Sequence, residues 1–315
     1  MLRCLRRLSK SANHEVWGQM DFFLAGYPKC GTTALYTYLN DHPETYFPEI
    51  KEPHYFSADL VNTGPSLSLE SYEGLYLKAN RGQLRGDASA STIHSSVALD
   101  RILAFNPSAK FVLLLRNPVA AARSFHGELL YNLNEDEQSF ERAWRLQGDR
   151  AAGRAIPNTC REPWMLQYAK VFEYRSHLPT FYEKLPESQR LTLIFEEFFE
   201  NPAASYRNVL DFLNLRDDRR VEFGSVNGAK QLRSRRLASL HDRVTSRNGA
   251  LYRTAKRALS TVGVHPSHLL SRFNVAVGRK QVLSNAFRAE LATSFHEDVK
   301  AAERALGRKI SVWDV

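Results

Sequence analysis

The stretch "AGYPKCGTTAL" (Ala25–Leu35) follows three apolar residues and is the strongest indication of the fold of this chain. A common phosphate-binding loop reads G-x-x-x-x-G-K-[ST] and joins a strand to a helix. Gly26 and Gly31 have this spacing, but Thr32 stands at the lysine position and Lys29 lies inside the loop. The loop therefore predicts an anion site in which a lysine approaches the ligand from within the turn.

The predicted strand–loop–helix unit explains why an anion would bind here. Backbone N–H groups and the positive end of the helix dipole point at the ligand. Thr32 and Thr33 add hydroxyl donors, and Lys29 adds a positive charge. A plain glycine-containing turn would need none of these three side chains.

A second candidate site is "KFVLLLRNPVAAARSFHGEL", a predicted strand that ends at Arg116 and is followed by a helix. Phosphoryl-transfer enzymes of the loop type end such a strand with an aspartate for Mg²⁺. Arginine instead binds oxyanions in a bidentate way, so we expect no metal here. Ser124 lies eight residues after Arg116. The alternative for Arg116 is an ion pair with a nearby carboxylate.

A third candidate is "EIKEPHYFS" (Glu49–Ser57), just after the first predicted helix. Its Lys-Glu-x-His pattern combines a base with a group that neutralises charge. Glu52 and His54 are the candidate bases. A surface loop of mixed charge is the alternative interpretation of this segment.

Continuous rather than alternating apolar runs predict strands of a parallel sheet that is covered on both faces. These runs lie near Asp21–Gly26, Lys110–Leu115 and Leu191–Phe195, with Leu84–Ser89 as a further strand candidate. Helical patterns cover Thr33–Asn40, Val119–Asn132, Trp164–Tyr182 and Asn285–Leu306, the last with Gly307 as its C-cap. The expected fold is a three-layer α/β domain with helices on both faces of a central parallel sheet.

Length and composition suit an ordinary globular protein of 315 residues, of which 43% are hydrophobic and 24% charged. The three cysteines fit neither a disulfide framework nor a zinc site, so a reducing cytoplasm is expected. Residues 1–20 form a basic N-terminal extension, which suits a solvated terminus or weak contact with a membrane surface. Residues 21–315 are expected to form one domain, and no nucleic-acid partner is expected.

The net charge of +9 is concentrated in one segment. Between Lys230 and Lys280 twelve Lys and Arg residues accompany a single acid, Asp242. We expect the stretch of about 217–280, which has poor periodicity, to form a basic cap or lid over an anionic ligand. A solvated basic loop is the alternative.

Together these motifs resemble the sulfotransferases that use 3′-phosphoadenosine 5′-phosphosulfate (PAPS), which have a P-loop-like fold. "YPKCGTTAL" looks like their 5′-phosphosulfate loop, and "RNPVAAARS" is similar to their 3′-phosphate motif. "KEPHYF" resembles a segment of the glycan-modifying branch, "LTLIFEEFFENP" the late strand with its acidic turn, and "ALGRKISVW" the end of bacterial members. The resemblance runs from about Asp21 to Trp313.

The resemblance implies a role for each matching residue. Lys29 would stabilise the leaving phosphate, Glu52 would act as the catalytic base, and His54 is the second candidate base. Arg116 and Ser124 would hold the 3′-phosphate. Phe195 would flank the adenine or belong to the core. The implied cofactor-binding residues are Lys29, Cys30, Gly31, Thr32, Thr33, Ala34, Arg116, Ser124, Phe195, Lys230 and Arg233.

Two features depart from the family pattern. An arginine commonly found five residues after the first one is Ala121 here, with Arg123 nearby. The Gly-rich basic cap of the cytosolic eukaryotic members is not visible, and Asn227–Arg236 is the candidate counterpart, with Lys230 and Arg233 as its cofactor contacts.

The sequence thus predicts a metal-independent transfer of a sulfuryl group from PAPS to a hydroxyl or amine acceptor by in-line displacement. The acceptor could be a glycan, a lipid or a small natural product. A P-loop kinase is one alternative, but it would need the missing lysine and a metal-binding aspartate. A non-catalytic protein that binds anions or membranes through the basic segment is the other.

Overall fold

The computed structural model describes residues 20–60, 67–224, 230–232, 275–277 and 282–314. The strands are β1 (Phe22–Gly26), β2 (Thr45–Tyr46), β3 (Leu84–Asp87), β4 (Lys110–Leu115), β5 (Arg190–Ile194), β6 (Lys230–Leu232) and β7 (Val275–Val277). The α-helices are α1 (Thr32–Asn40), α2 (Leu69–Gly74), α3 (Ala98–Phe105), α4 (Pro118–Tyr131), α5 (Phe140–Arg145), α6 (Gln147–Ala151), α7 (Tyr168–Val171), α8 (Tyr174–Lys184), α9 (Phe195–Glu200), α10 (Pro202–Leu213), α14 (Asn285–Ser294) and α15 (His296–Leu306). Short 3-10 helices cover Ala90–His94, Pro163–Leu166, Glu187–Gln189 and Ser311–Trp313.

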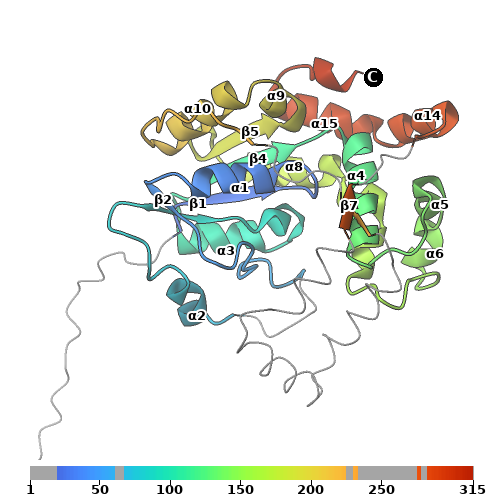
Figure 1. Cartoon of the computed structure of the whole chain (residues 1–315), viewed down its shortest axis with the longest axis horizontal. Coiled ribbons are helices and arrows are strands. Elements are labelled where there is room, and N and C mark those ends of the chain that lie inside the picture. Colours follow the sequence, from blue (N-terminus) through green and yellow to red (C-terminus); the bar gives the residue numbers. More distant parts are fainter. Residues whose placement is uncertain (1–19, 61–66, 225–229, 233–274, 278–281, 315) are drawn as a thin grey trace, which may run out of the picture.

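Five parallel strands in the order β2-β3-β1-β4-β5 form the central sheet, and helices surround it (Figure 1). Strand β1 therefore lies between β3 and β4, and the loop that follows β1 lies next to the end of β4. Ligands of open parallel sheets bind at the carboxyl ends of such strands. The predicted three-layer α/β fold is confirmed.

Alternating side chains of β1 show why both faces of the sheet are covered. Phe22 packs edge-on against Phe47, which also contacts Tyr36 of α1. Phe23 stacks on Phe111 of β4, which packs in turn against α8 on the opposite face. All residues of β1 are buried, as the continuous apolar run predicted.

The predicted strands agree with β1, β3, β4 and β5, except that Phe195 begins α9 instead of ending β5. The single helix predicted at Trp164–Tyr182 is wrong, because the chain forms a 3-10 helix, α7 and α8 there. Phe172 and Tyr174 are both fully buried. Residues two apart point about 200° apart on a helix, so a turn between α7 and α8 is needed to bury both.

The C-terminal helix predicted at Asn285–Leu306 is split into α14 and α15 at Phe295. Phe287, Leu291 and Phe295 are nevertheless all buried. Gly307 ends α15 with φ 64°, as expected of a C-cap glycine. Asp298, buried at the start of α15, accepts a hydrogen bond from the Arg175 backbone N–H (3.1 Å) and so joins α15 to α8.

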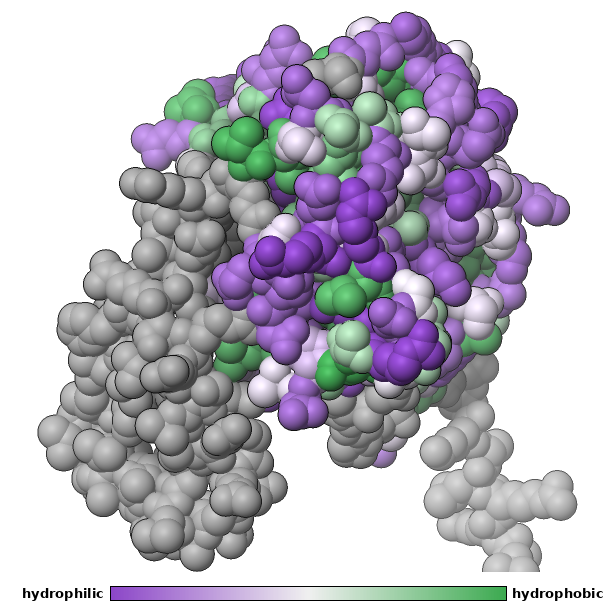
Figure 2. Space-filling view, turned by 90° about the vertical axis from the view of Figure 1, so that its right-hand side faces the viewer, coloured by the Kyte–Doolittle hydropathy of each residue, from purple (hydrophilic) through white to green (hydrophobic). Residues whose placement is uncertain are grey.

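A short antiparallel pair, β6 with β7, lies beside α4 in Figure 1. Of the predicted basic cap at about 217–280, only residues 217–224 and these two strands are described, and nearly all of the extension 1–20 also lies outside the described residues. Figure 2 shows the side of the molecule that carries α5, α6 and α14, where hydrophilic residues cover most of the surface that the described residues form. Within the described part of the chain, no helix is both long and apolar enough to span a membrane.

Candidate active site

The loop between β1 and α1 packs so closely on its neighbours that glycine is required twice. A Cβ atom on Gly26 would lie 2.8 Å from the Leu114 carbonyl oxygen of β4. Gly31, the N-cap of α1, has φ 96°, and a Cβ there would lie 3.1 Å from the ring of Phe195. The loop is thus held against β4 and α9, and the N-terminal N–H groups of α1 are presented at the carboxyl edge of the sheet.

Two of the predicted loop donors are used within the loop itself. The Cys30 backbone N–H donates to the Tyr27 carbonyl (3.2 Å), and the Ala34 N–H donates to the Gly31 carbonyl (3.0 Å). The N–H groups of Gly31, Thr32 and Thr33 precede the first full helical turn, where helix geometry provides no acceptor four residues earlier. These three groups are therefore the best placed to bind an anion.

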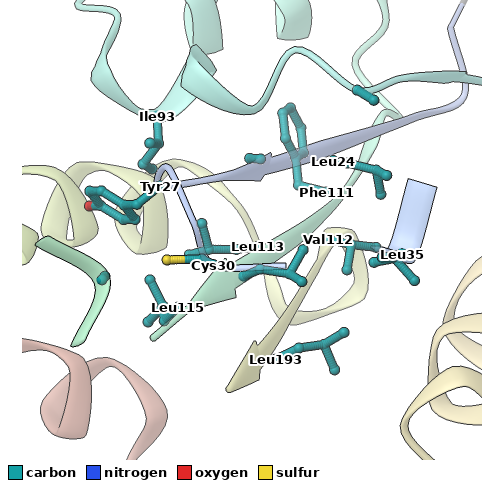
Figure 3. Packing of buried hydrophobic residues seen from close by; sticks show 14 of the residues in the cluster. Leu24, Tyr27, Cys30, Leu35, Ile93, Phe111, Val112, Leu113, Leu115 and Leu193 are labelled. Atoms are coloured by element: carbon teal, nitrogen blue, oxygen red, sulfur yellow. The ribbon is translucent and has the colours of Figure 1, made fainter. Parts of the chain in front are cut away.

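Cys30 points its side chain into the core, among the residues around β4 (Figure 3). Burial raises the pKa of its thiol to about 12. A thiol is a nucleophile only as thiolate, so this side chain is unsuited to catalysis.

Lys29 adopts φ 65°, a left-handed conformation that is uncommon for residues other than glycine. Its ammonium lies 2.7 Å from the Oε2 atom of Glu128 on α4, and both side chains are partly exposed. Ser124 precedes Glu128 by one helical turn and so lies on the same face of α4. The structure therefore brings Lys29 close to the α4 face that carries Ser124.

Arg116 follows β4 directly and reaches back to the loop. Its Nη1 donates to the Lys29 carbonyl (2.9 Å), and its guanidinium lies 4.0 Å from the centre of the Phe195 ring. Among the described residues, the expected alternative, a carboxylate partner, is present only as a long contact of 3.9 Å between Nε and Glu196. The buried Nε has no hydrogen-bond partner within the described residues. An unsatisfied buried donor of this kind is suited to binding an anion.

Phe195 is the first residue of α9, and its ring borders the loop beside a second aromatic ring, Phe199. Its ring centre is 4.6 Å from that of Phe199, whose side chain is exposed. Phe195 is itself partly exposed, and it contacts the guanidinium of Arg116. The position is compatible with stacking on a base, and the choice between that role and a core role stays a prediction.

Glu52 lies in a segment that contacts α1. Its Oε1 accepts a hydrogen bond from the Lys51 ammonium (2.7 Å), and its Oε2 lies 3.4 Å from Nε2 of His54. Burial alone would raise the pKa of Glu52, but the hydrogen bond from His54 and the charge of Lys51 hold it below its ordinary value. Glu52 is thus a carboxylate at neutral pH, as a base must be.

His54 is fixed by residues that follow β3. Its backbone N–H donates to Ser89 Oγ (3.0 Å), and Nδ1 lies 3.2 Å from Ser91 Oγ. The buried carboxylate of Asp87 accepts a hydrogen bond from the Ser89 N–H (2.8 Å). His54 has φ 53°, so it shares with Lys29 a strained backbone of the kind that clusters at functional sites.

Arg123 and Ala121 also lie on α4. Ala121, which replaces the arginine common in the resembled family, is fully buried and makes no polar contribution. The pKa of Arg123 is lowered by burial first and then by the charges of Arg288 and Arg116. Lys230 belongs to β6, which lies beside α4, whereas Arg233 lies outside the described residues.

Sequence reasoning missed Glu128, Lys51, Ser89 and Ser91 as parts of the site. Glu128 had a weak signal, because it lies four residues after Ser124 in a predicted helix. Lys51 was visible in its motif as a charge neutraliser, but nothing indicated its contact with α1. Ser89 and Ser91 meet His54 only through the fold.

Comparison with known proteins gives a consistent result. The family model "Sulfotransferase domain" matches residues 19–254. Carbohydrate sulfotransferase 15 of Homo sapiens is 26% identical over 246 residues, covering 62% of this chain and 43% of that protein. Heparan sulfate glucosamine 3-O-sulfotransferase 3B1 of Mus musculus is 27% identical over 208 residues, covering 65% of this chain and 49% of that protein.

Among solved structures, a sulfotransferase from Alicyclobacillus acidocaldarius superposes with a TM-score of 0.67 at 22% identity, covering 94% of this chain and 99% of that one. This likeness shows that the two chains share a P-loop-like fold. The chain spans about half or less of the length of the curated relatives described above. Because the family model matches most of the chain and the fold agrees with it, the protein belongs to the sulfotransferase domain family.

Proposed function

We propose that the protein transfers a sulfuryl group from PAPS to a hydroxyl or amine acceptor by in-line displacement without a metal ion. The observation that carries this proposal is the geometry around Lys29. Lys29 belongs to the loop and its ammonium lies beside Glu128 of α4, while Arg116 occupies the place of a metal-binding aspartate and donates to the Lys29 carbonyl.

The donor carries anionic groups that match the donors around the loop. The N–H groups of Gly31, Thr32 and Thr33, together with the helix dipole of α1, suit the 5′-phosphate. Arg116 offers an unsatisfied buried Nε. Ser124 lies on the face of α4 that meets the loop, and with Arg116 it suits the 3′-phosphate. Lys230 and Arg233 remain candidates for further contacts with the donor. Cys30 and Ala34 of the loop, and Phe195 beside it, complete the proposed donor-binding residues.

The donor supplies an activated sulfuryl group whose transfer leaves adenosine 3′,5′-bisphosphate. Lys29 stabilises the negative charge that develops on the leaving phosphate, as preorganised donors do in related chemistry. Glu52 accepts the proton of the acceptor as the new S–O or S–N bond forms. His54, 3.4 Å from Glu52, orients that carboxylate or takes over as base.

The acceptor class is suggested by the relatives, whose names describe carbohydrate and heparan sulfate sulfotransferases. A glycan hydroxyl or amine is therefore the first candidate, with a lipid or a small natural product next. Cys30 and Cys160 are free cysteines, which supports a reducing compartment such as the cytoplasm. The proposal includes weak contact of the basic N-terminal extension with a membrane surface. It includes no nucleic-acid partner.

The test is a screen of sulfate transfer. The full chain is incubated with PAPS labelled in its sulfate, first with a metabolite extract and then with defined glycans and lipids. We expect label in an acceptor and stoichiometric adenosine 3′,5′-bisphosphate. Tight binding of the bisphosphate without any turnover of PAPS in all acceptor mixtures would favour a non-catalytic anion-binding protein.

A further inference from the structure

The segment that carries Glu52 is attached to helix α1 by one side chain, Lys51. The Lys51 ammonium donates to Glu52 Oε1 at 2.7 Å and to Thr33 Oγ1 at 3.2 Å. The same ammonium lies 5.6 Å from the centre of the Tyr36 ring. Thr33 and Tyr36 are one turn apart on α1, so the ammonium lies along the first turns of this helix.

This position joins two parts of the site that are separate in sequence. Thr33 belongs to the turn whose N–H groups face the proposed phosphosulfate position. Glu52 is the residue proposed above to accept the proton of the acceptor. An ammonium has three N–H donors, and two of those of Lys51 have partners among the described residues. A third remains for an anion bound at the N-terminus of α1.

Resting on the function proposed above, we infer that Lys51 is a positioning residue that fastens the Glu52 segment to the donor-binding turn of α1 and shares its charge between Glu52 and the bound donor. The acceptor base and the donor are thereby held at a fixed separation. Because coupling between two sites is reciprocal, the ionisation of Glu52 and the affinity for the donor depend on each other through this side chain.

Removing the ammonium should have two effects. Without the neighbouring positive charge, Glu52 is more easily protonated, because an opposite charge at this distance favours the ionised form. The fraction of Glu52 that can accept a proton then falls as the solution becomes acidic. A bound anion also loses one partner, so donor affinity decreases.

A matched control exists three residues before Glu52. Glu49 pairs with Lys78 at 2.8 Å, and both side chains are mostly exposed. Lys78→Met removes the same charge from a lysine–glutamate pair that includes Glu49 of the same segment. Among the described residues no hydrogen bond or ion pair joins this pair to α1. Lys51→Arg preserves the charge and serves as the conservative variant.

The experiment compares wild type, Lys51→Met, Lys51→Arg and Lys78→Met after thermal melting has verified folding. Calorimetry measures affinity for adenosine 3′,5′-bisphosphate, and transfer rates at saturating PAPS are followed from pH 7 to pH 5. For Lys51→Met we expect affinity to fall about fivefold. We also expect its rate relative to wild type to fall a further fivefold or so between pH 7 and pH 5. Lys51→Arg should retain most of both properties, and Lys78→Met should match wild type.

Several results would overturn the inference. If the rate of Lys51→Met relative to wild type does not change with pH, Lys51 does not act on the ionisation of Glu52. If the affinity of Lys51→Met for the bisphosphate is unchanged, Lys51 does not act on the bound donor. Equal effects of Lys78→Met would show that only bulk charge matters. A wild-type protein that neither binds the bisphosphate nor turns over PAPS contradicts the proposed function itself, and with it this inference.

Discussion

The ammonium of Lys29 and the carboxylate of Glu128 are 2.7 Å apart, although 99 positions separate them in the sequence. The pair bridges the loop after β1 and the helix after β4, which lie together because β1 and β4 are neighbouring strands. In this arrangement the lysine proposed to stabilise the leaving group is held by a carboxylate from the Ser124 face of α4. A bound donor must compete with Glu128 for the ammonium of Lys29.

Glu128→Gln should therefore tighten binding of adenosine 3′,5′-bisphosphate by about three- to tenfold, because the carboxylate that competes for Lys29 is removed. Calorimetry measures the change. Glu141→Gln, in the exposed pair of Glu141 with Arg145 on α5, is the control for net charge and should leave affinity unchanged. Weaker binding in Glu128→Gln would mean that Glu128 positions Lys29 for the donor instead of competing with it.

Lys29→Ala should lower the transfer rate by about 10²–10³-fold, since it removes charge stabilisation that is concentrated in the transition state. The rate is measured at saturating PAPS with labelled sulfate. Affinity for the bisphosphate should change far less, because backbone N–H groups and Arg116 remain. A rate within a few-fold of wild type would remove Lys29 from the mechanism.

Glu52→Gln should abolish turnover while leaving affinity for the bisphosphate within about threefold of wild type, because the amide cannot accept the acceptor's proton. His54→Ala is measured beside it and should retain part of the activity. If Glu52→Gln stays active and His54→Ala does not, His54 is the base.

Activity should survive removal of divalent ions, because Arg116 stands at the end of β4 where a metal-binding aspartate would be needed. Transfer is measured after dialysis against a chelator. Loss of activity that Mg²⁺ restores would contradict the metal-independent mechanism.

Arg150→Met should destabilise the fold by about 3–5 kcal/mol, since it leaves the carboxylate of Glu135 buried without its cation. Arg150 and Glu135 form a bidentate ion pair, and both side chains are 0% exposed. The Tyr168 hydroxyl donates to the same carboxylate. Urea unfolding measures the loss. Arg142→Met, in the pair of the exposed Arg142 with the partly buried Glu137, is the control and should cost about 1 kcal/mol or less.

The same pair gives a pH dependence of stability. Burial alone would raise the pKa of Glu135, but hydrogen bonds from Arg150 and Tyr168 hold it below its ordinary value. A carboxyl group with a lowered pKa in the folded state stabilises the fold above its unfolded pKa. Wild type should therefore lose this contribution as pH falls below about 4.5 towards the lowered pKa, and a variant without the pair should lose less over that range.

Much of the fold could be predicted because its signals are local. The continuous apolar runs of β1 and β4 specify buried parallel strands, and Gly26 and Gly31 specify a tight loop between a strand and a helix. The break between α7 and α8 was missed, because Phe172 and Tyr174 both fit a helical sequence pattern. Only the position of the surrounding core shows that both rings must be buried.

The sequence by itself determined the loop, the strand that ends in arginine and the Glu52 segment, because each depends on residues that are close in the chain. Only the tertiary structure decided which charges meet. Lys29 with Glu128, Lys51 with Thr33 and His54 with Ser91 are brought together by the strand order of the sheet and by the way α1 and α4 pack on it. A side-chain contact of this kind depends on distances of a few ångströms between distant segments, which composition, spacing and periodicity do not encode.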